Sequence, residues 1–519
     1  MPRPGVDELV ATILDPGSIE PWHFDVPDSS VVQPYRAELE EARKATGRRE
    51  SVIACCGTVN GRRVAVIAGD PAFLGGSIGV SAGERLTRAI ERATAERLPL
   101  IALPVGGGTR MQEGTVAFLQ MVKIAGAVMA HKEERLPYLV YLRHPTMGGV
   151  FASWGSLGHV TLAEPGALVG FLGPRVYEAL YGERFPEGVQ LSDNLAERGV
   201  IDAVCEPEEL SSYLDRLLNV VAERPVVGTA GPAATPRLPD VPAWESVLRT
   251  RLPDRPGLRE LLQHAARDVT MLNGTGDGES HPGSVLALAR WGDAPCVVVG
   301  QDRHDQGRPL DPAALREVRR GIRLARELNL PLLSVIDTPG AALSKEAEER
   351  GLASEIARTL SELITLPTAT VSLLMGQGTG GIALALTPAD VVVASQHAWL
   401  APLPPEGASA IVHRTVDRAP EMATAQGIRA ADLLRAGIVD RVVLEPEDPG
   451  AERRQFCRSL GLALHDEIQR VVSMDDAERR ERRRLRFRTL GLSLDPPIGR
   501  AASGTRWVHR EELPGVPGA

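Results

Sequence analysis

The stretch Tyr141–Arg175, YLRHPTMGGVFASWGSLGHVTLAEPGALVGFLGPR, contains the glycine pair around which the chain is organised. An apolar run at 138–142 predicts a buried strand, and the small residues at 152–156 are able to begin a helix. Between them, Gly148 and Gly149 allow close backbone approach and leave N–H groups unpaired at a helix start. Such a turn can hold an oxyanion with backbone donors alone, although an isolated glycine pair is more often only a tight turn.

The second half of the chain repeats this arrangement. The strand residues Pro99 and Pro331 are 232 residues apart, and so are the glycines Gly148 and Gly380 of the two glycine-rich turns. A constant offset of this kind indicates duplication of one unit. Because strands alternate with helices in each half, we predict an α/β fold with a largely parallel sheet in each.

A chain of 519 residues is too long for one ordinary core. Residues 224–243 are rich in Pro, Ala and Gly, which predicts a linker. We therefore predict a first domain at 1–223, a second domain at 244–474, and a basic helix with a tail at 475–519. We predict that the basic helix exposes its charged face to solvent, and contact with phosphates is the alternative.

Composition excludes several classes of protein. Hydrophobic and charged contents of 43% and 24% are typical of a soluble globular protein, and a net charge of −9 argues against general nucleic-acid binding. We find no apolar run of 18 residues and no signal peptide, so we expect a cytoplasmic location without membrane contact. The five cysteines form no C-x-x-C pair, which indicates reduced, buried thiols and predicts no metal site.

Three local patterns make sharp structural predictions. Two apolar runs flank Asn60 and Gly61, which predicts a β-hairpin. Long helical patterns at Thr115–Glu134 and Glu346–Leu363 each predict one continuous helix.

The motif inventory is mostly negative, with no G-x-S-x-G, H-E-x-x-H or Walker lysine. Gly376, Gly378 and Gly381 fit G-x-G-x-x-G, so a dinucleotide site is an alternative. It requires an acidic residue at the end of the next strand, whereas Asp390 comes before that strand. What remains is one backbone donor turn in each half without an obvious side-chain acid or base.

Several motifs in each half carry a family resemblance. Residues 51–205 resemble the β subunit of bacterial acetyl-CoA carboxylase carboxyltransferase, through GGGTRMQ (106–112), PTMGGVFAS (145–153), AEP (163–165), GFLGPRV (170–176) and PEG (186–188). Residues 244–445 resemble its α subunit, through IDTPG (336–340), AEERGLASEI (347–356), GQGTGGIAL (376–384) and PEGA (405–408). The order is that of the fused acyl-CoA carboxylase carboxyltransferases.

This resemblance implies two tandem crotonase-like domains and a transferase. The family moves carboxylate from carboxybiotin on a carrier protein to acetyl-CoA, which gives malonyl-CoA for fatty acid synthesis. Carboxybiotin releases CO2, its N1 takes the α-proton of the acyl-CoA, and two enolates arise. By the family's assignment, Gly148 and Gly149 would hold the thioester enolate, and Gly380, Gly381 and Ile382 the biotin ureido oxygen.

The resemblance also implies partners and further contacts. For CoA or biotin, our candidate contacts are Gly107, Gly108, Arg110, Arg175 and Gly340. Because the chain has no biotin-attachment motif and no ATP-grasp segment, we expect the biotin carboxyl carrier protein and biotin carboxylase on separate chains. A homo-oligomer with sites at subunit interfaces is implied as well.

The chain departs from the family in three places, one of which is the segment Ala341–Leu343 after IDTPG, where the family is richer in glycine. It has no four-cysteine zinc ribbon, and Ile382 stands where a glycine is usual, which we expect to narrow the pocket. Propionyl-CoA or a longer acyl-CoA is the alternative substrate, because nothing in the sequence determines acyl length. Two hypotheses of a different kind stay open: a non-catalytic scaffold of a carboxylase complex, and another crotonase-like enzyme with a carboxylate base.

Overall fold

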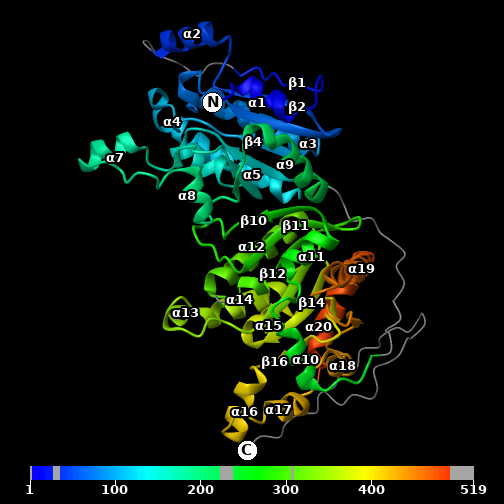
Figure 1. The fold of residues 1–519 in the computed structure, drawn as a ribbon. Helices are drawn as coiled ribbons and strands as arrows, with labels where there is room; N and C mark the ends of the chain where they lie inside the picture. Colours follow the sequence, from blue (N-terminus) through cyan, green and yellow to red (C-terminus); the bar gives the residue numbers. More distant parts are fainter. Residues whose placement is uncertain (1–2, 27–34, 223–237, 306–308, 491–519) are drawn as a thin grey trace, which may run out of the picture.

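The computed structural model describes residues 3–26, 35–222, 238–305 and 309–490. The N-terminal half lies above the C-terminal half, and each half is built around its own sheet (Figure 1). Of the predicted linker, residues 224–237 lie outside the described part, so the domain boundaries stay a prediction.

The first sheet has the strand order β1-β2-β3-β4-β5-β7-β9. Its strands are β1 (Glu20–Pro21), β2 (Val52–Val59), β3 (Arg62–Gly69), β4 (Leu100–Leu103), β5 (Tyr138–Leu142), β7 (Val160–Ala163) and β9 (Ala203–Val204), with β6 (Thr146–Met147) and β8 (Val169–Gly170) paired separately. The hairpin prediction is confirmed, because β2 and β3 are antiparallel and Asn60 and Gly61 both have positive φ. From β3 onward the pairing is parallel.

The second sheet repeats this topology in the order β10-β11-β12-β13-β14-β15-β17, with β16 beside β14. Its strands are β10 (Arg267–Leu272), β11 (Ser284–Trp291), β12 (Ala294–Gln301), β13 (Leu332–Thr338), β14 (Thr370–Thr379), β15 (Val391–Ser395), β16 (Trp399–Ala401) and β17 (Arg441–Val443). Ala65 pairs with Leu100, and Val297 pairs with Leu332, again at an offset of 232. The duplication is therefore confirmed at the level of strand register.

Helices cover both sheets. The first half contains α1 (Val6–Ile13), α2 (Tyr35–Thr46), α3 (Val80–Ala95), α4 (Gly114–Phe118), α5 (Gln120–Glu133), α6 (Gly148–Val150), α7 (Pro174–Tyr181), α8 (Ser192–Glu197) and α9 (Pro207–Val221), with η1 (Leu74–Gly76), η2 (Met111–Glu113) and the π-turn η3 (Phe151–Gly155). The second half contains α10 (Ala243–Thr250), α11 (Leu258–Ala265), η4 (Arg303–Asp305), α12 (Pro312–Leu328), α13 (Lys345–Glu349), α14 (Leu352–Ile364), α15 (Gly380–Leu386), α16 (Pro405–His413), α17 (Ala419–Ala425), α18 (Ala430–Arg435), α19 (Arg453–Val472) and α20 (Asp476–Arg488).

Helix α12 shows why these segments fold as they do. The Asp311 side chain accepts a hydrogen bond from Ala314 N at 3.1 Å and caps the start, with Pro312 in the first turn. Leu315, Val318 and Ile322, together with the other apolar residues on the same face of the helix, are buried against the sheet. Asn329 ends the helix in the left-handed conformation, φ 53°.

Both long-helix predictions are wrong in the same way, since each helix is broken. Helices α4 and α5 meet at Leu119 with a bend of 43°. The Glu113 carboxylate accepts from Val80 N, at the start of α3, at 2.6 Å, which holds the beginning of α4 there while α5 packs along α3. Helices α13 and α14 are separated by Gly351, whose φ is +80°.

Membrane-span criteria are not met by any single helix of the described residues. The bent pair Met111–Phe118 and Gln120–Glu133 meets them only when its two parts are taken together, by length and composition.

The two halves share a core and an ion cluster. Helix α9 packs on β10 and β11 of the second sheet. Glu327 of α12 lies 3.1 Å from Lys132 Nζ and 3.4 Å from His159 Nε2, both in the first half. His159 Nδ1 accepts from Tyr138 N at 3.0 Å, and burial lowers the pKa of His159, so the neutral ring carries its proton on Nε2, toward Glu327.

We expect Glu327→Gln to lower the free energy of unfolding by about 2 kcal/mol at pH 7. Burial opposes the charged form of Glu327, but His159 and Lys132 outweigh it and lower its pKa to about 2, from 4.5. A depressed carboxylate pKa stabilises the fold above the unfolded pKa, and this contribution is lost as the pH falls from about 4.5 toward 2. Urea unfolding of the unsubstituted protein and of Glu327→Gln measures the two free energies of unfolding. Their difference should shrink between pH 6 and pH 3, and a difference that stays constant contradicts the ion-pair explanation.

The basic helix α20 has a solvated face, as predicted, with Arg480, Arg482 and Arg484 exposed, but its opposite face is anchored through the buried Arg479 and Arg483. It packs on the second half of the chain beside α18 and β14 (Figure 1), with Arg483 wholly buried. Arg483 donates Nε to Asp390 Oδ1 at 2.8 Å and Nη2 to Asp390 Oδ2 at 2.7 Å, while Nη1 donates to Leu366 O at 2.8 Å. The guanidinium therefore anchors the helix instead of meeting a phosphate. All five cysteines are free and buried, as predicted.

Candidate active site

The first glycine turn forms where β6 ends and α6 begins. Met147 is extended, and Gly148 follows with φ +58°, a conformation that L side chains rarely adopt. The neighbouring loop holds the turn through two backbone bonds: Gly106 N donates to Pro145 O at 2.7 Å, and Met147 N donates to Gly106 O at 3.0 Å. Because the first N–H groups of a helix have no intrahelical partner, the backbone N–H groups of this turn are available as hydrogen-bond donors to a ligand.

The loop at 106–108 fits against this turn only because it lacks side chains. Gly108 has φ +108°, and a Cβ there would lie 3.2 Å from Gly149 N, over the donor. A Cβ on Gly148 would lie 3.2 Å from Gly107 O. Gly107 and Gly108, predicted as contacts for CoA or biotin, thus pack against the glycine pair and leave the Gly149 N–H uncovered; their contact with either group stays a prediction.

The second turn is a geometric copy. Thr379 is extended and Gly380 has φ +69° at the start of α15. Thr338 pairs with Gly378, as Gly106 pairs with Thr146 in the first half. Gly340, the counterpart of Gly108, has φ +130° and only Thr379 Cγ2 within 4 Å of its missing Cβ. The structure thus brings Gly340 to the second turn, and its predicted contact with CoA or biotin stays a prediction.

Ile382 does not narrow a pocket. Its side chain is wholly buried in the hydrophobic core that also contains Leu332 and Leu386. Only its backbone N–H is available as a donor, so the expectation of a narrowed pocket is wrong. The physical reason is the helix geometry of α15, which turns position 382 toward the sheet.

The other glycines of the GQGTGG segment have a packing role. A Cβ on Gly376 would lie 2.3 Å from Asp337 Oδ1, which accepts from Gln377 N at 3.0 Å. A Cβ on Gly378 would lie 2.8 Å from Trp399 O. Both glycines lie within strand β14, and this placement disfavours the dinucleotide alternative.

Arg110 is not free to contact CoA. Its side chain has no exposed surface and forms a bidentate ion pair with Glu50, at 2.6 and 2.9 Å. Its remaining donors reach the Tyr35 hydroxyl, Ser51 Oγ and the backbone and hydroxyl oxygens of Ser77. The prediction of phosphate contact is corrected: Arg110 braces the 106–112 loop from inside. The side chain of Arg175 lies outside what the structure describes.

Glu164, the acidic residue that follows β7, also has a bracing role. Its Oε2 accepts from His144 N at 2.9 Å and lies 3.3 Å from Arg3 Nε. This carboxylate positions the segment that leads into the first turn. It belongs to the support of the turn, which relies on backbone donors.

The family model described as carboxyl transferase domain matches residues 26–474, which is most of the chain. The chain belongs to the carboxyl transferase family. It is 56% identical to the probable biotin-dependent acyl-coenzyme A carboxylase beta3 subunit of Mycobacterium tuberculosis H37Rv, over 95% of this chain and 100% of that one. It is 37% identical to the acetyl-coenzyme A carboxylase carboxyl transferase subunits beta/alpha of Salinispora arenicola, over 93% and 90%.

Solved structures show the same fold. A transcarboxylase 12S structure, described as a hexamer with methylmalonyl-coenzyme A and methylmalonic acid bound, superposes with a TM-score of 0.71 at 20% identity, over 89% of this chain and 90% of that one. A single-chain, multi-domain long-chain acyl-CoA carboxylase gives 0.68 at 20% identity, over 88% of this chain and 46% of that one. The carboxyl transferase has the crotonase-like fold that the sequence predicted, and it is a transferase.

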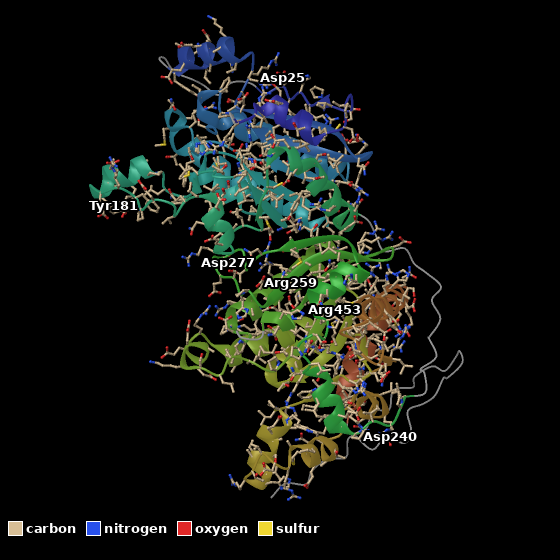
Figure 2. The ribbon with its side chains drawn as sticks, in the orientation of Figure 1. Asp25, Tyr181, Asp240, Arg259, Asp277 and Arg453 are labelled. Atoms are coloured by element: carbon tan, nitrogen blue, oxygen red, sulfur yellow. The ribbon has the colours of Figure 1, made fainter. Side chains whose placement is uncertain are left out.

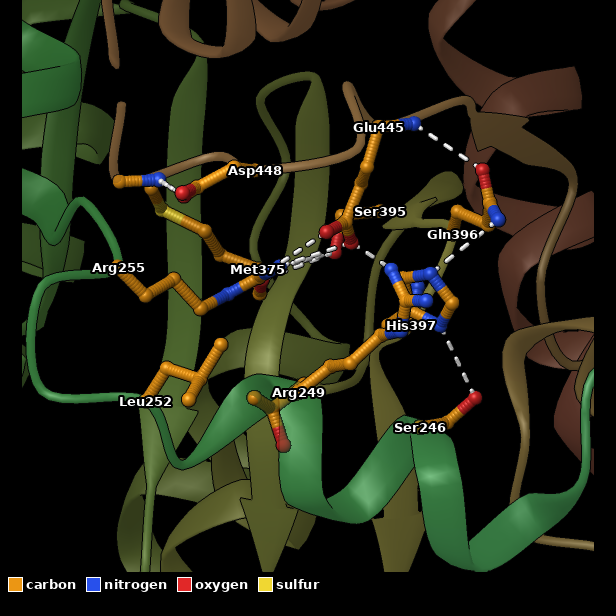
Figure 3. Close-up of polar contacts among 12 residues, drawn as sticks. Ser246, Arg249, Leu252, Arg255, Met375, Ser395, Gln396, His397, Glu445 and Asp448 are labelled. Carbon is orange, nitrogen blue, oxygen red and sulfur yellow. Dashed lines mark hydrogen bonds and ion pairs between the residues drawn. The ribbon is translucent and has the colours of Figure 1, made fainter. Parts of the chain in front are cut away.

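A buried polar network, which sequence reasoning missed, supports the second turn of this carboxyl transferase. Arg255 donates to Glu445 at 2.6 and 2.8 Å, and both side chains are buried (Figure 3). Arg255 Nη2 also donates to Met375 O at 2.9 Å, within the strand that leads to Gly380. Glu445 Oε1 accepts from His397 N at 2.9 Å. No local pattern signals this network, because its members come together only in the folded chain.

Proposed function

We propose that this carboxyl transferase moves carboxylate from carboxybiotin, carried on a separate protein, to acetyl-CoA, which gives malonyl-CoA for fatty acid synthesis in the cytoplasm. The repeated pair of glycine turns carries this proposal. A reaction with two developing oxyanions needs two sets of preorganised donors, and each half supplies one. The names of the mycobacterial and Salinispora relatives support the biotin-dependent chemistry.

Each turn has a separate role in this scheme. The Gly148–Gly149 turn donates backbone N–H groups to the thioester oxygen of the acyl-CoA. The Gly380–Ile382 turn donates to the ureido oxygen of biotin, which supplies the carboxyl group and accepts the α-proton. The missing Cβ atoms at Gly108 and Gly340 leave room for these two groups. Each donor supplies a few kcal/mol of transition-state stabilisation, as deletions of oxyanion-hole donors typically show.

A longer acyl-CoA is the second candidate substrate. The relative of higher identity, at 56%, is named for acyl-coenzyme A, and the relative named for acetyl-coenzyme A is 37% identical. A panel of acetyl-, propionyl- and longer acyl-CoA substrates separates the two candidates. We expect the largest kcat/KM for acetyl-CoA, and a larger value for any longer substrate overturns that choice while leaving the reaction class intact.

The reaction itself has a direct assay. With free biotin or a biotinylated carrier, the purified protein should decarboxylate malonyl-CoA in the reverse direction, and omission of biotin should abolish turnover. Retention of turnover without biotin favours another crotonase-like enzyme. Absence of turnover with every acyl-CoA, in a folded oligomer, leaves the non-catalytic scaffold.

Exposed apolar side chains support a homo-oligomer with sites at subunit interfaces. Phe171, Leu180 and Tyr181, on α7 and before it, are 65–69% exposed, and Ile411 and Val412 of α16 are 60–61% exposed. Helices α7 and α16–α17 project from the body of the chain (Figure 1). Exposed apolar patches of this kind mark interaction surfaces.

We expect the double substitution Ile411→Asp with Val412→Asp to dissociate the oligomer and to abolish turnover without unfolding the chain. Burying two charges in an apolar contact is unfavourable by several kcal/mol. Sedimentation velocity measures the assembly, and circular dichroism checks the fold. An unchanged sedimentation coefficient removes α16 from the interface.

A further inference from the structure

A cavity of about 410 Å³ lies at the junction of the two halves, away from both glycine turns. The first half contributes Asp202 before β9 and Arg216 of α9, and the second half contributes strand β10, the segment around His281, and Glu317 of α12. Figure 2 labels Arg259, another lining residue, in the upper part of the second half. This volume falls within the range of small-molecule sites.

Two buried polar groups line the cavity with unused hydrogen-bonding capacity. Thr270 is 3% exposed, and its Oγ1 has no partner among the residues that the structure describes. Glu317 is 3% exposed, and its Oε1 accepts from Gly274 N at 3.2 Å. The Ser284 hydroxyl and the His281 backbone lie near this carboxyl, although Oε2 makes no bond of good geometry in the described chain. Buried polar groups of this kind are normally satisfied by a ligand or by water.

The charges around the cavity favour an anion. Asp202 is neutralised, because Arg320 lies 2.9 Å from it and Thr161 N donates to it. Arg216 is exposed at the rim, with its guanidinium 5.2 Å from the Tyr213 ring and no carboxylate within ion-pair distance in the described part of the chain.

The other groups at the rim add donors. Arg259 forms an ion pair with the buried Asp302, at 2.7 Å from Nε, and its Nη2 donates to Pro282 O at 3.5 Å. Arg259 therefore offers its Nη1 donors, while the uncompensated charge at the rim, among the described residues, is that of Arg216. His281 Nδ1 accepts from Gly283 N at 3.1 Å, so the neutral ring directs an Nε2–H donor elsewhere. Burial raises the pKa of Glu317 to about 7, so near neutrality part of the population offers a carboxylic O–H donor.

We propose that this cavity is a binding site for a small hydroxylated organic anion, with a carboxylate or phosphate head on Arg216 and Arg259. The hydroxyl groups of the ligand pair with Thr270 and Glu317. Because the lining comes from both halves of the chain, such a ligand bridges them and stabilises their arrangement. The site is separate from the glycine turns, so it does not depend on the acyl substrate.

Isothermal titration of the full-length protein with 3-phosphoglycerate, succinate and inorganic phosphate tests this proposal. We expect 3-phosphoglycerate to bind most tightly, because it carries a phosphate, a carboxylate and a hydroxyl group. Thr270→Val and Arg216→Ala should each weaken that binding at least tenfold. Arg482→Ala, which removes an exposed arginine on α20, is the matched control and should leave it unchanged.

Two results overturn the proposal: no probe binds with a Kd below about 10 mM, or binding persists unchanged in both cavity variants. Tighter binding of succinate or of phosphate alone, lost in both variants, keeps the site and identifies which head group it selects. The acyl-CoA turnover of Thr270→Val should match the unsubstituted protein. Binding is measured without turnover, so failure here and failure of the carboxyl transfer assay are distinguishable.

Discussion

Gly108→Ala should lower kcat for carboxyl transfer at least 100-fold, the loss typical when one oxyanion donor is removed. The added Cβ would lie 3.2 Å from Gly149 N and cover that donor, and the φ of +108° is one that alanine rarely adopts. The loss should appear in kcat more than in the KM for acyl-CoA, because the donor acts mainly on the charge that develops in the transition state. Steady-state kinetics of the reverse reaction with biotin measures both parameters.

Gly5→Ala is the matched control, since among the described residues a Cβ there meets nothing within 4 Å and no positive φ is involved. Gly149→Ala should be milder than Gly108→Ala, because its Cβ meets the flexible Met121 side chain. Gly148→Val should abolish turnover, since its Cβ would lie 3.2 Å from Gly107 O at a φ of +58°. A Gly108→Ala enzyme that melts normally and retains full kcat removes this turn from the mechanism.

Arg483→Ala should lower the free energy of unfolding by about 3 kcal/mol, near the low end for a broken buried ion pair. The substitution leaves Asp390 buried with a weaker set of partners, Arg479 at 3.5 Å and the Thr370 N–H at 2.8 Å. It also removes the hydrogen bond from Arg483 to the carbonyl oxygen of Leu366, near the end of α14. Urea denaturation followed by circular dichroism measures the change.

Arg484→Ala is the control on the same helix. Arg484 is 66% exposed and pairs only with Glu481 in the described chain, so its loss should change stability by less than about 0.5 kcal/mol. Arg483→Lys should lower the free energy of unfolding by an amount between those of Arg483→Ala and Arg484→Ala, because lysine keeps the charge but cannot form the bidentate pair. Equal effects of Arg483→Ala and Arg484→Ala would show that α20 is not anchored through Asp390.

Several features were predictable because their causes are local or repeated in the chain. The Asn60–Gly61 hairpin follows from turn chemistry, and the constant offset of 232 residues revealed the duplication that the strand registers confirm. Helices α4 and α13 were not predictable as separate elements, because their apolar patterns continue across the breaks. Contact of Glu113 with the start of α3 and a positive φ at Gly351 decide those breaks.

The amino-acid sequence by itself determined the family and the pair of glycine turns, because a turn that requires positive φ and close backbone approach admits almost no residue but glycine. Tertiary structure alone decided what the side chains around the turns do. The sequence predicts a phosphate contact for Arg110, whereas in the structure Arg110 is a buried partner of Glu50. The sequence predicts that Ile382 narrows the pocket, whereas its side chain packs in the core. The physical reason is that burial and ion pairing depend on residues far apart in the chain, which only the folded protein brings together.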